Sequence, residues 1–200
     1  VMGVPGGMPG TAAALVAGVN TLPAEVTSWS ATGIGRSTLP VMLASLSMGG
    51  ALSLMLAEKR PDDVAGLVMV NPAVTAMSRL VPFAGTLRRF VPTVAGIAND
   101  AMLEIDEGAY DRTPLAAVAG MYRLWCEVRP YLDLVSCPLL IFRSEVDHVV
   151  PPTSVEIITR QVSSTDVTVH RLANSYHVAT MDNDAGFIVD TSLEFMAERS

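Results

Sequence analysis

The sequence predicts an α/β fold with a mostly parallel sheet flanked by helices, and three segments carry this prediction. Residues 41–44 are an apolar run that ends abruptly, which is typical of a buried strand. Residues 50–59 combine apolar residues with terminal charges, which indicates a helix that ends at Pro61. Residues 64–70 form a second apolar run. A strand–turn–helix–strand unit of this kind is a crossover, which makes its two strands parallel.

The composition fits one globular domain, residues 1–200, and argues against several classes of protein. The chain is 50% hydrophobic, which is too apolar for a disordered protein. Its net charge of -7 offers no basic surface for nucleic acid. No apolar stretch approaches the roughly 20 residues that span a bilayer, so we expect no stable insertion into membranes.

The two cysteines indicate a reducing compartment. Cys126 and Cys137 occur without a CxxC motif and without a cluster of histidines. This pattern predicts neither a disulfide framework nor a zinc site. Reduced thiols are typical of cytoplasmic proteins, so we predict a cytoplasmic location.

The turn between the first predicted strand and its helix has the features of a nucleophile elbow. Residues 45–49 read SLSMG, which matches the pattern G-x-S-x-G except that Ser45 replaces the first glycine. The motif needs small neighbours because strand and helix pack closely around the central residue, here Ser47. A glycine-containing turn with an incidental serine is the alternative, and the position between strand and helix favours the elbow.

The acid that would support such a serine is expected after another strand, because catalytic groups gather at the carboxyl edge of parallel sheets. Residues 138–142 are typical of a buried strand, and Asp147 follows it after a short turn. Pro151 and Pro152 then open the next helix. Glu145 lies within the turn and Asp166 precedes its strand, so both fit less well than Asp147.

A serine hydroxyl also needs a base, and the chain offers three histidines, His148, His170 and His177. His177 lies in the loop after the predicted strand 167–172, at the sheet edge where the elbow and the acid should also lie. His170 lies inside that strand, where a surface or cross-strand role fits better. His148 neighbours the predicted acid and is a second candidate, although adjacent side chains should point apart. We therefore predict His177 as the base, which gives the order serine, acid, histidine of proteins with nucleophile elbows.

These residues carry a resemblance to a known family. The resemblance rests on the stretches LSMGGALSLMLAEKRPDDVAGLVMVNPA, AYDRTPL, CPLLIFRSEVDHVVPP and SSTDVTVHRLANSYHVATMDND. They are similar to the bacterial carboxylesterase and monoacylglycerol lipase branch of the α/β-hydrolase superfamily, over about residues 44–198.

The resemblance implies a function and a role for each residue. Ser47 would be the nucleophile, Asp147 the acid and His177 the base of a serine hydrolase. The backbone N–H of Met48 would be one donor of the oxyanion hole. The family hydrolyses small-molecule carboxylic esters, including those of glycerol with one acyl chain, and it needs no metal or cofactor.

Residues 74–136 fall where this family inserts a small lid. The segments 76–97 and 114–132 are apolar enough to be amphipathic helices, which would be either plain core helices or part of an acyl pocket. The residues that would line such a pocket are some of Leu80, Phe83, Phe90 and Met121.

The first 40 residues depart from the family pattern. They contain no His-Gly, and residues 7–11 (GMPGT) are the segment that could correspond to the family's oxyanion loop. On this reading the first three strands are missing, and we expect Val41–Ser45 to present an unpaired edge. A truncated gene or a shifted reading frame would explain this start. We then expect a weak esterase that aggregates through this edge, unless Gly6-Gly7 supplies the second donor.

Two other classes of function stay open at this level. One is an acyltransferase that uses the same triad with another acceptor. The other is a non-catalytic fragment whose oxyanion hole is incomplete.

Overall fold

The computed structural model describes residues 13–16, 40–96, 100–105, 108 and 110–199. In these residues five strands form one sheet in the order β1-β2-β3-β6-β7, and every neighbouring pair is parallel. The strands are β1 (Ala13–Val16), β2 (Val41–Leu46), β3 (Val64–Val70), β6 (Leu139–Ser144) and β7 (Val167–Leu172). The parallel sheet predicted from the sequence is therefore confirmed.

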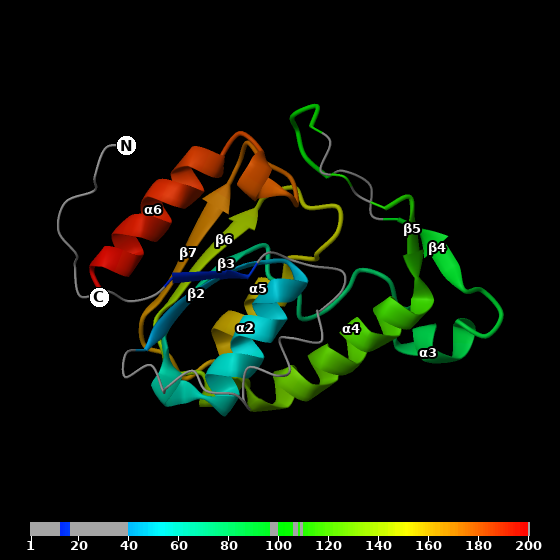
Figure 1. Ribbon diagram of the computed structural model, residues 1–200, viewed down its shortest axis with the longest axis horizontal. Coiled ribbons are helices and arrows are strands. Elements are labelled where there is room, and N and C mark those ends of the chain that lie inside the picture. The colour runs from blue at the N-terminus through cyan, green and yellow to red at the C-terminus, as the bar shows by residue number, and fades with distance from the viewer. Residues whose placement is uncertain (1–12, 17–39, 97–99, 106–107, 109, 200) are drawn as a thin grey trace, which may run out of the picture.

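Helices cover both faces of the sheet (Figure 1). One face carries α2 (Met48–Lys59), α4 (Leu115–Val128) and α5 (Thr153–Gln161), and the other carries α6 (Ala185–Ala197). Short 3-10 turns are η1 (Pro61–Asp63), η3 (Arg129–Leu134) and η4 (Ala179–Met181). No helix in the described part of the chain is both long and apolar enough to cross a bilayer.

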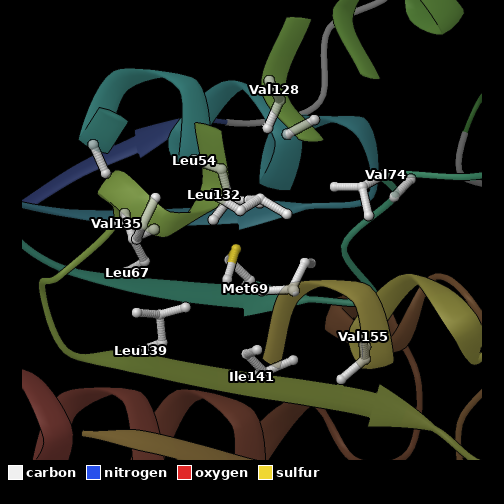
Figure 2. Close-up of a cluster of buried hydrophobic side chains, with 14 of the residues drawn as sticks. Leu54, Leu67, Met69, Val74, Val128, Leu132, Val135, Leu139, Ile141 and Val155 are labelled. Carbon is white, nitrogen blue, oxygen red and sulfur yellow. The ribbon is translucent and has the colours of Figure 1, made fainter. Parts of the chain in front are cut away.

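The central strands are apolar along their whole length because both of their faces are buried. Leu67 and Met69 of β3 point toward Leu54 of α2 in the larger core cluster, which Figure 2 shows. The alternate residues Val68 and Val70 belong to a second cluster, which the α6 side chains complete. This arrangement fixes the register of the strands, so that their carboxyl ends meet at one edge.

The prediction of an unpaired edge at Val41–Ser45 is wrong. Strand β1 pairs in parallel with β2, with Ala13 opposite Met42 and Val16 opposite Ser45. The other neighbour of β2 is β3, so the elbow strand is an internal strand of the sheet. The physical reason is that the uncharged AALV run of β1 is itself able to form a strand. The predicted loss of the family's first strands falls largely on residues outside the described ranges.

The segment between β3 and β6 contains one long helix and several short elements. These are η2 (Val81–Phe83), α3 (Ala84–Leu87), β4 (Thr93–Ala95), β5 (Arg112–Pro114) and α4. Strands β4 and β5 form an antiparallel pair, which lies with α3 at the outer end of α4, away from the sheet (Figure 1).

The helix predicted in residues 114–132 is confirmed as α4, whereas the helix predicted in residues 76–97 is wrong. Pro82, Gly85 and Pro92 interrupt that apolar segment. Proline removes a helical hydrogen bond and glycine weakens a helix, so the only helical elements in the described residues of this segment are the 3-10 turn η2 and the four-residue helix α3.

Candidate active site

Ser47 stands at the sharp turn between β2 and α2. Its φ of 54° and ψ of -120° lie outside the regions that non-glycine residues normally adopt. Its N–H donates to Val70 O at 3.0 Å, and its carbonyl accepts the N–H of Ala73 at 2.9 Å. The end of β3 therefore holds this strained turn from one side, as a nucleophile elbow requires.

The small residues around Ser47 allow the close approach of helix and strand. A Cβ at Gly50 would lie 2.6 Å from Pro72 Cβ, so a larger residue does not fit there without movement. Ser45, which stands where the motif has its first glycine, is buried, and its Oγ lies 3.4 Å from Val68 O. The serine is tolerated because its hydroxyl has an acceptor on the neighbouring strand.

The backbone N–H of Met48 is available as a donor. Met48 is the first residue of α2, where an N–H has no acceptor within the helix. Among the described residues this N–H meets no other acceptor. A free N–H next to Ser47 fits an oxyanion donor. The predicted second donor, in Gly6-Gly7 or the 7–11 segment, lies outside the described residues.

The structure brings His177 and Asp147 into direct contact. His177 Nδ1 lies 2.9 Å from Asp147 Oδ2, and both side chains are 7% exposed. Asp147 Oδ1 accepts the N–H groups of Val149 at 2.8 Å and Val150 at 2.7 Å. The carboxylate is thus fixed by its own turn, with its other oxygen facing the imidazole. Donation from Nδ1–H to the carboxylate leaves the lone pair of Nε2 free to accept a proton.

Ser47 and His177 reach the same edge of the sheet from different strands. Ser47 follows β2, whereas His177 follows β7, and both strands are parallel. Among the residues that the structure describes, no hydrogen bond joins Ser47 Oγ to His177. The link between them runs through the end of β3 and the residue after it, because the Val70 carbonyl accepts the Ser47 N–H and the Asn71 side chain donates to the His177 carbonyl.

Asn71 is a residue of this edge that the sequence reasoning missed. It is buried and has a φ of 44°. Its Nδ2 donates to His177 O at 2.8 Å and to Ser144 Oγ at 3.0 Å, and its Oδ1 accepts the Ser144 N–H at 2.8 Å. It therefore joins the ends of β3 and β6 to the His177 loop. Its only sequence signal is a polar residue, followed by proline, directly after an apolar strand.

Asp182 is a second residue that the sequence reasoning missed. It follows His177 by five positions and binds the same loop. Its carboxylate accepts the N–H groups of Tyr176 (3.0 Å), Met102 (2.7 Å), Leu103 (3.1 Å) and Asn183 (2.9 Å). Burial alone would raise the pKa of Asp182, but these four donors outweigh it and hold the pKa below its ordinary value. The carboxylate therefore stays charged and joins Tyr176 to Met102 and Leu103.

The other candidate bases and acids have different surroundings. His170 stacks on Phe142 with ring centroids 5.7 Å apart, which is the cross-strand role expected for it. His148 is 58% exposed and contacts Asp100 rather than Asp147. Asp166 forms an ion pair with Arg199 at 2.7 Å. None of these three contacts involves His177 or Ser47.

The residues proposed for an acyl pocket do not share one environment. Leu80, Phe83 and Phe90 are 65%, 60% and 81% exposed, respectively, on the segment between β3 and β6. Met121 of α4 packs instead against the larger core cluster. The pocket stays a prediction.

Comparison with known proteins agrees with this fold. A solved structure from a study of the metagenome-derived lipolytic enzymes LipS and LipT superposes with a TM-score of 0.76 at 35% identity, over 80% of this chain and 65% of that one. The mouse alpha/beta hydrolase domain-containing protein 10 superposes with a TM-score of 0.60 at 20% identity, over 88% of this chain and 68% of that one. The fold is therefore that of the α/β-hydrolases, as the sequence predicts.

A family model described as "Serine aminopeptidase, S33" matches residues 26–184, and the chain belongs to this family. A thermostable monoacylglycerol lipase of Bacillus sp. (strain H-257) is 40% identical over 162 residues. That match covers 80% of this chain and 64% of the lipase, so the chain spans less than two thirds of that relative's length.

Proposed function

We propose that this protein is a serine hydrolase that cleaves carboxylic esters through an acyl-enzyme, with monoacylglycerols as its substrates. The observation that carries the proposal is the buried His177–Asp147 contact at the sheet edge where the strained Ser47 turn also lies. The substrate class is supported by the 40% identical monoacylglycerol lipase and by the lipolytic solved relative.

In the first half of the reaction Ser47 is the nucleophile. Its Oγ attacks the ester carbonyl carbon while Nε2 of His177 takes the hydroxyl proton. The imidazolium that forms is stabilised by the Asp147 carboxylate, which also fixes the ring orientation. The negative oxygen of the tetrahedral intermediate accepts a hydrogen bond from the backbone N–H of Met48. The intermediate collapses when His177 returns its proton to the leaving alcohol, for which glycerol is the proposed case.

In the second half a water molecule replaces the alcohol. His177 removes a proton from this water, whose oxygen attacks the acyl carbonyl carbon. The second tetrahedral intermediate collapses to release the fatty acid, while His177 returns its proton to Ser47 Oγ. The overall result is addition of water across the ester bond, so no oxidant, reductant or other co-reactant is required.

We further propose that residues 1–200 act as one domain in which residues 74–136 form a lid over the ester site. Support comes from the exposed apolar side chains Leu80, Phe83 and Phe90, which are available to an acyl chain. The free thiols of Cys126 and Cys137 support a reducing compartment, for which we propose the cytoplasm.

Covalent labelling tests the proposed nucleophile without depending on the rate of turnover. A fluorophosphonate should label the native chain once, on the peptide that contains Ser47, because only an activated serine reacts readily. Heat-denatured chain is the control and should not react. Absence of label on the native chain, or label on a different peptide, would contradict the proposal.

A further inference from the structure

Asp100 lies outside the sheet, yet its carboxylate contacts the loops of both the predicted acid and the predicted base. Its Oδ2 accepts the N–H of His177 at 3.2 Å and the N–H of His148 at 3.2 Å. Its Oδ1 lies 2.7 Å from His148 Nδ1, and its main-chain oxygen accepts the Val178 N–H at 2.9 Å. The Asp100 side chain is only 12% exposed, so these contacts are largely shielded from water.

The two N–H groups bound by Oδ2 belong to different loops. His177 follows β7, whereas His148 directly follows Asp147 in the loop after β6. One carboxylate oxygen therefore ties the acid loop to the base loop, and it does so beside the 2.9 Å contact between Asp147 and His177. Charged acceptors make stronger hydrogen bonds than neutral ones, which suits Asp100 to this link.

Asp100 completes a two-sided support of the His177 backbone. On one side the buried Asn71 donates to the His177 carbonyl at 2.8 Å. On the other side Asp100 accepts the His177 N–H, and its own carbonyl accepts the next N–H, that of Val178. The peptide groups before and after the histidine Cα are thus both held, which limits rotation of the imidazole away from Asp147.

The segment that carries Asp100 is itself bonded to the same loop. Met102 and Leu103 donate their N–H groups to Asp182, which also accepts the N–H of Tyr176. Residues 100–103 and 176–178 therefore form one hydrogen-bonded unit, although 77 residues separate Asp100 from His177. The segment between β3 and β6 reaches the predicted base through this unit.

We propose that Asp100 is a positioning residue that holds the acid loop and the base loop in register, and this inference rests on the proposed function. Its removal should leave His177 able to reach orientations in which it no longer faces Asp147. Because misplacement of a catalytic group by about 1 Å can cost on the order of 10²-fold in rate, we expect Asp100→Ala to lower kcat by roughly 10- to 100-fold. KM should change less than kcat, because the contacts of Asp100 are to the acid and base loops and not to the Ser47 turn.

The experiment compares Asp100→Ala with a rescue variant and a matched control. Asp100→Asn keeps one acceptor oxygen and should recover much of the lost kcat. Asp184→Ala removes a carboxylate that accepts the Asn174 N–H at 3.0 Å in the same region but touches neither His177 nor His148. It should leave kcat near the wild-type value. Counting active sites with a fluorophosphonate corrects each rate for any unfolded fraction.

Proton NMR of the low-field Nδ1–H of His177 provides a readout that does not depend on turnover. This signal should be sharp in the wild-type chain and in Asp184→Ala, and broadened or lost in Asp100→Ala, because it requires the Asp147 contact. If Asp100→Ala keeps both the wild-type kcat per active site and the sharp signal, the positioning role is overturned while the proposed function stands. If the wild-type chain hydrolyses no ester but its signal is lost in Asp100→Ala, the function fails and the positioning role stands.

Discussion

Ser47 and Asn71 are the two non-glycine residues with a left-handed φ in the described part of the chain, 54° and 44°. Such a backbone costs about 1–3 kcal/mol per residue unless its surroundings hold it. The Asn71 N–H donates to Phe142 O at 2.8 Å, and the Ser47 N–H donates to Val70 O at 3.0 Å, so neighbouring strands fix both turns. The strain is concentrated where the proposed chemistry occurs.

Glu58 gives a prediction at the same scale for the pH dependence of stability. Burial raises the pKa of Glu58 from 4.5 to about 7; the charge of Lys59 opposes this shift and that of Asp133 adds to it. Its Oε1 has no hydrogen-bond partner among the described residues. Between pH 4.5 and about 7 the folded chain holds this proton and the unfolded chain does not. The stability that it contributes is therefore present at low pH and lost as the pH rises through this window.

Replacement of Glu58 by glutamine removes this titration. We compare the free energy of unfolding of Glu58→Gln with that of the wild type at two pH values. The difference, variant minus wild type, should be greater at pH 8 than at pH 4.5 by roughly 1–3 kcal/mol. Urea unfolding of both chains at the two pH values measures this difference. An equal difference at both pH values would show that burial does not perturb the Glu58 carboxyl.

At the scale of elements, strands β2, β3, β6 and β7 were predictable, whereas only helix α4 was predictable in the segment between β3 and β6. The runs 64–70 and 167–172 match β3 and β7 because apolar strands bounded by turn residues are set by local sequence. The 76–97 segment has a similar apolar content, but its prolines and glycine allow only short elements. A prediction from apolar content alone therefore assigns too much helix to a segment that contains prolines and glycine.

The packing of α2 on the chain after β3 gives a prediction about Gly50. A Cβ at this position would meet Pro72 Cβ at 2.6 Å, and the atoms of a proline ring cannot rotate away. We expect Gly50→Ala to lower the free energy of unfolding by roughly 1–3 kcal/mol, despite the better helix propensity of alanine.

Gly120 in α4 is the matched control for this substitution. The nearest heavy atom to a Cβ there is an Arg123 side-chain nitrogen at 4.0 Å, so alanine fits. Gly120→Ala should therefore stabilise the chain, by up to about 1 kcal/mol. Thermal unfolding compares the two variants, and equal shifts in Tm would argue against the close contact at Gly50.

For the whole molecule, the sequence suggested the predicted acid and base but not the residues that hold the base loop from other parts of the chain. Asp147 and His177 could be chosen because parallel strands bring their carboxyl ends to one edge, and the structure places these two side chains in contact. Asn71 and Asp100 could not, because they bind His177 across 106 and 77 residues without a spacing signal. The pairing of β1 with β2 was missed because residues 1–40 lack the family's motifs.

The central claim, that Ser47 is the nucleophile of an ester hydrolase, is tested most directly by ester turnover in two serine variants of the same motif. Hydrolysis of p-nitrophenyl butyrate should fall by at least about 10³-fold in Ser47→Ala, since the other groups alone give only residual catalysis. Ser45→Ala, two residues earlier and buried against Val68, should stay close to the wild-type rate. A Ser47→Ala variant that hydrolyses the ester at the full wild-type rate would contradict the account.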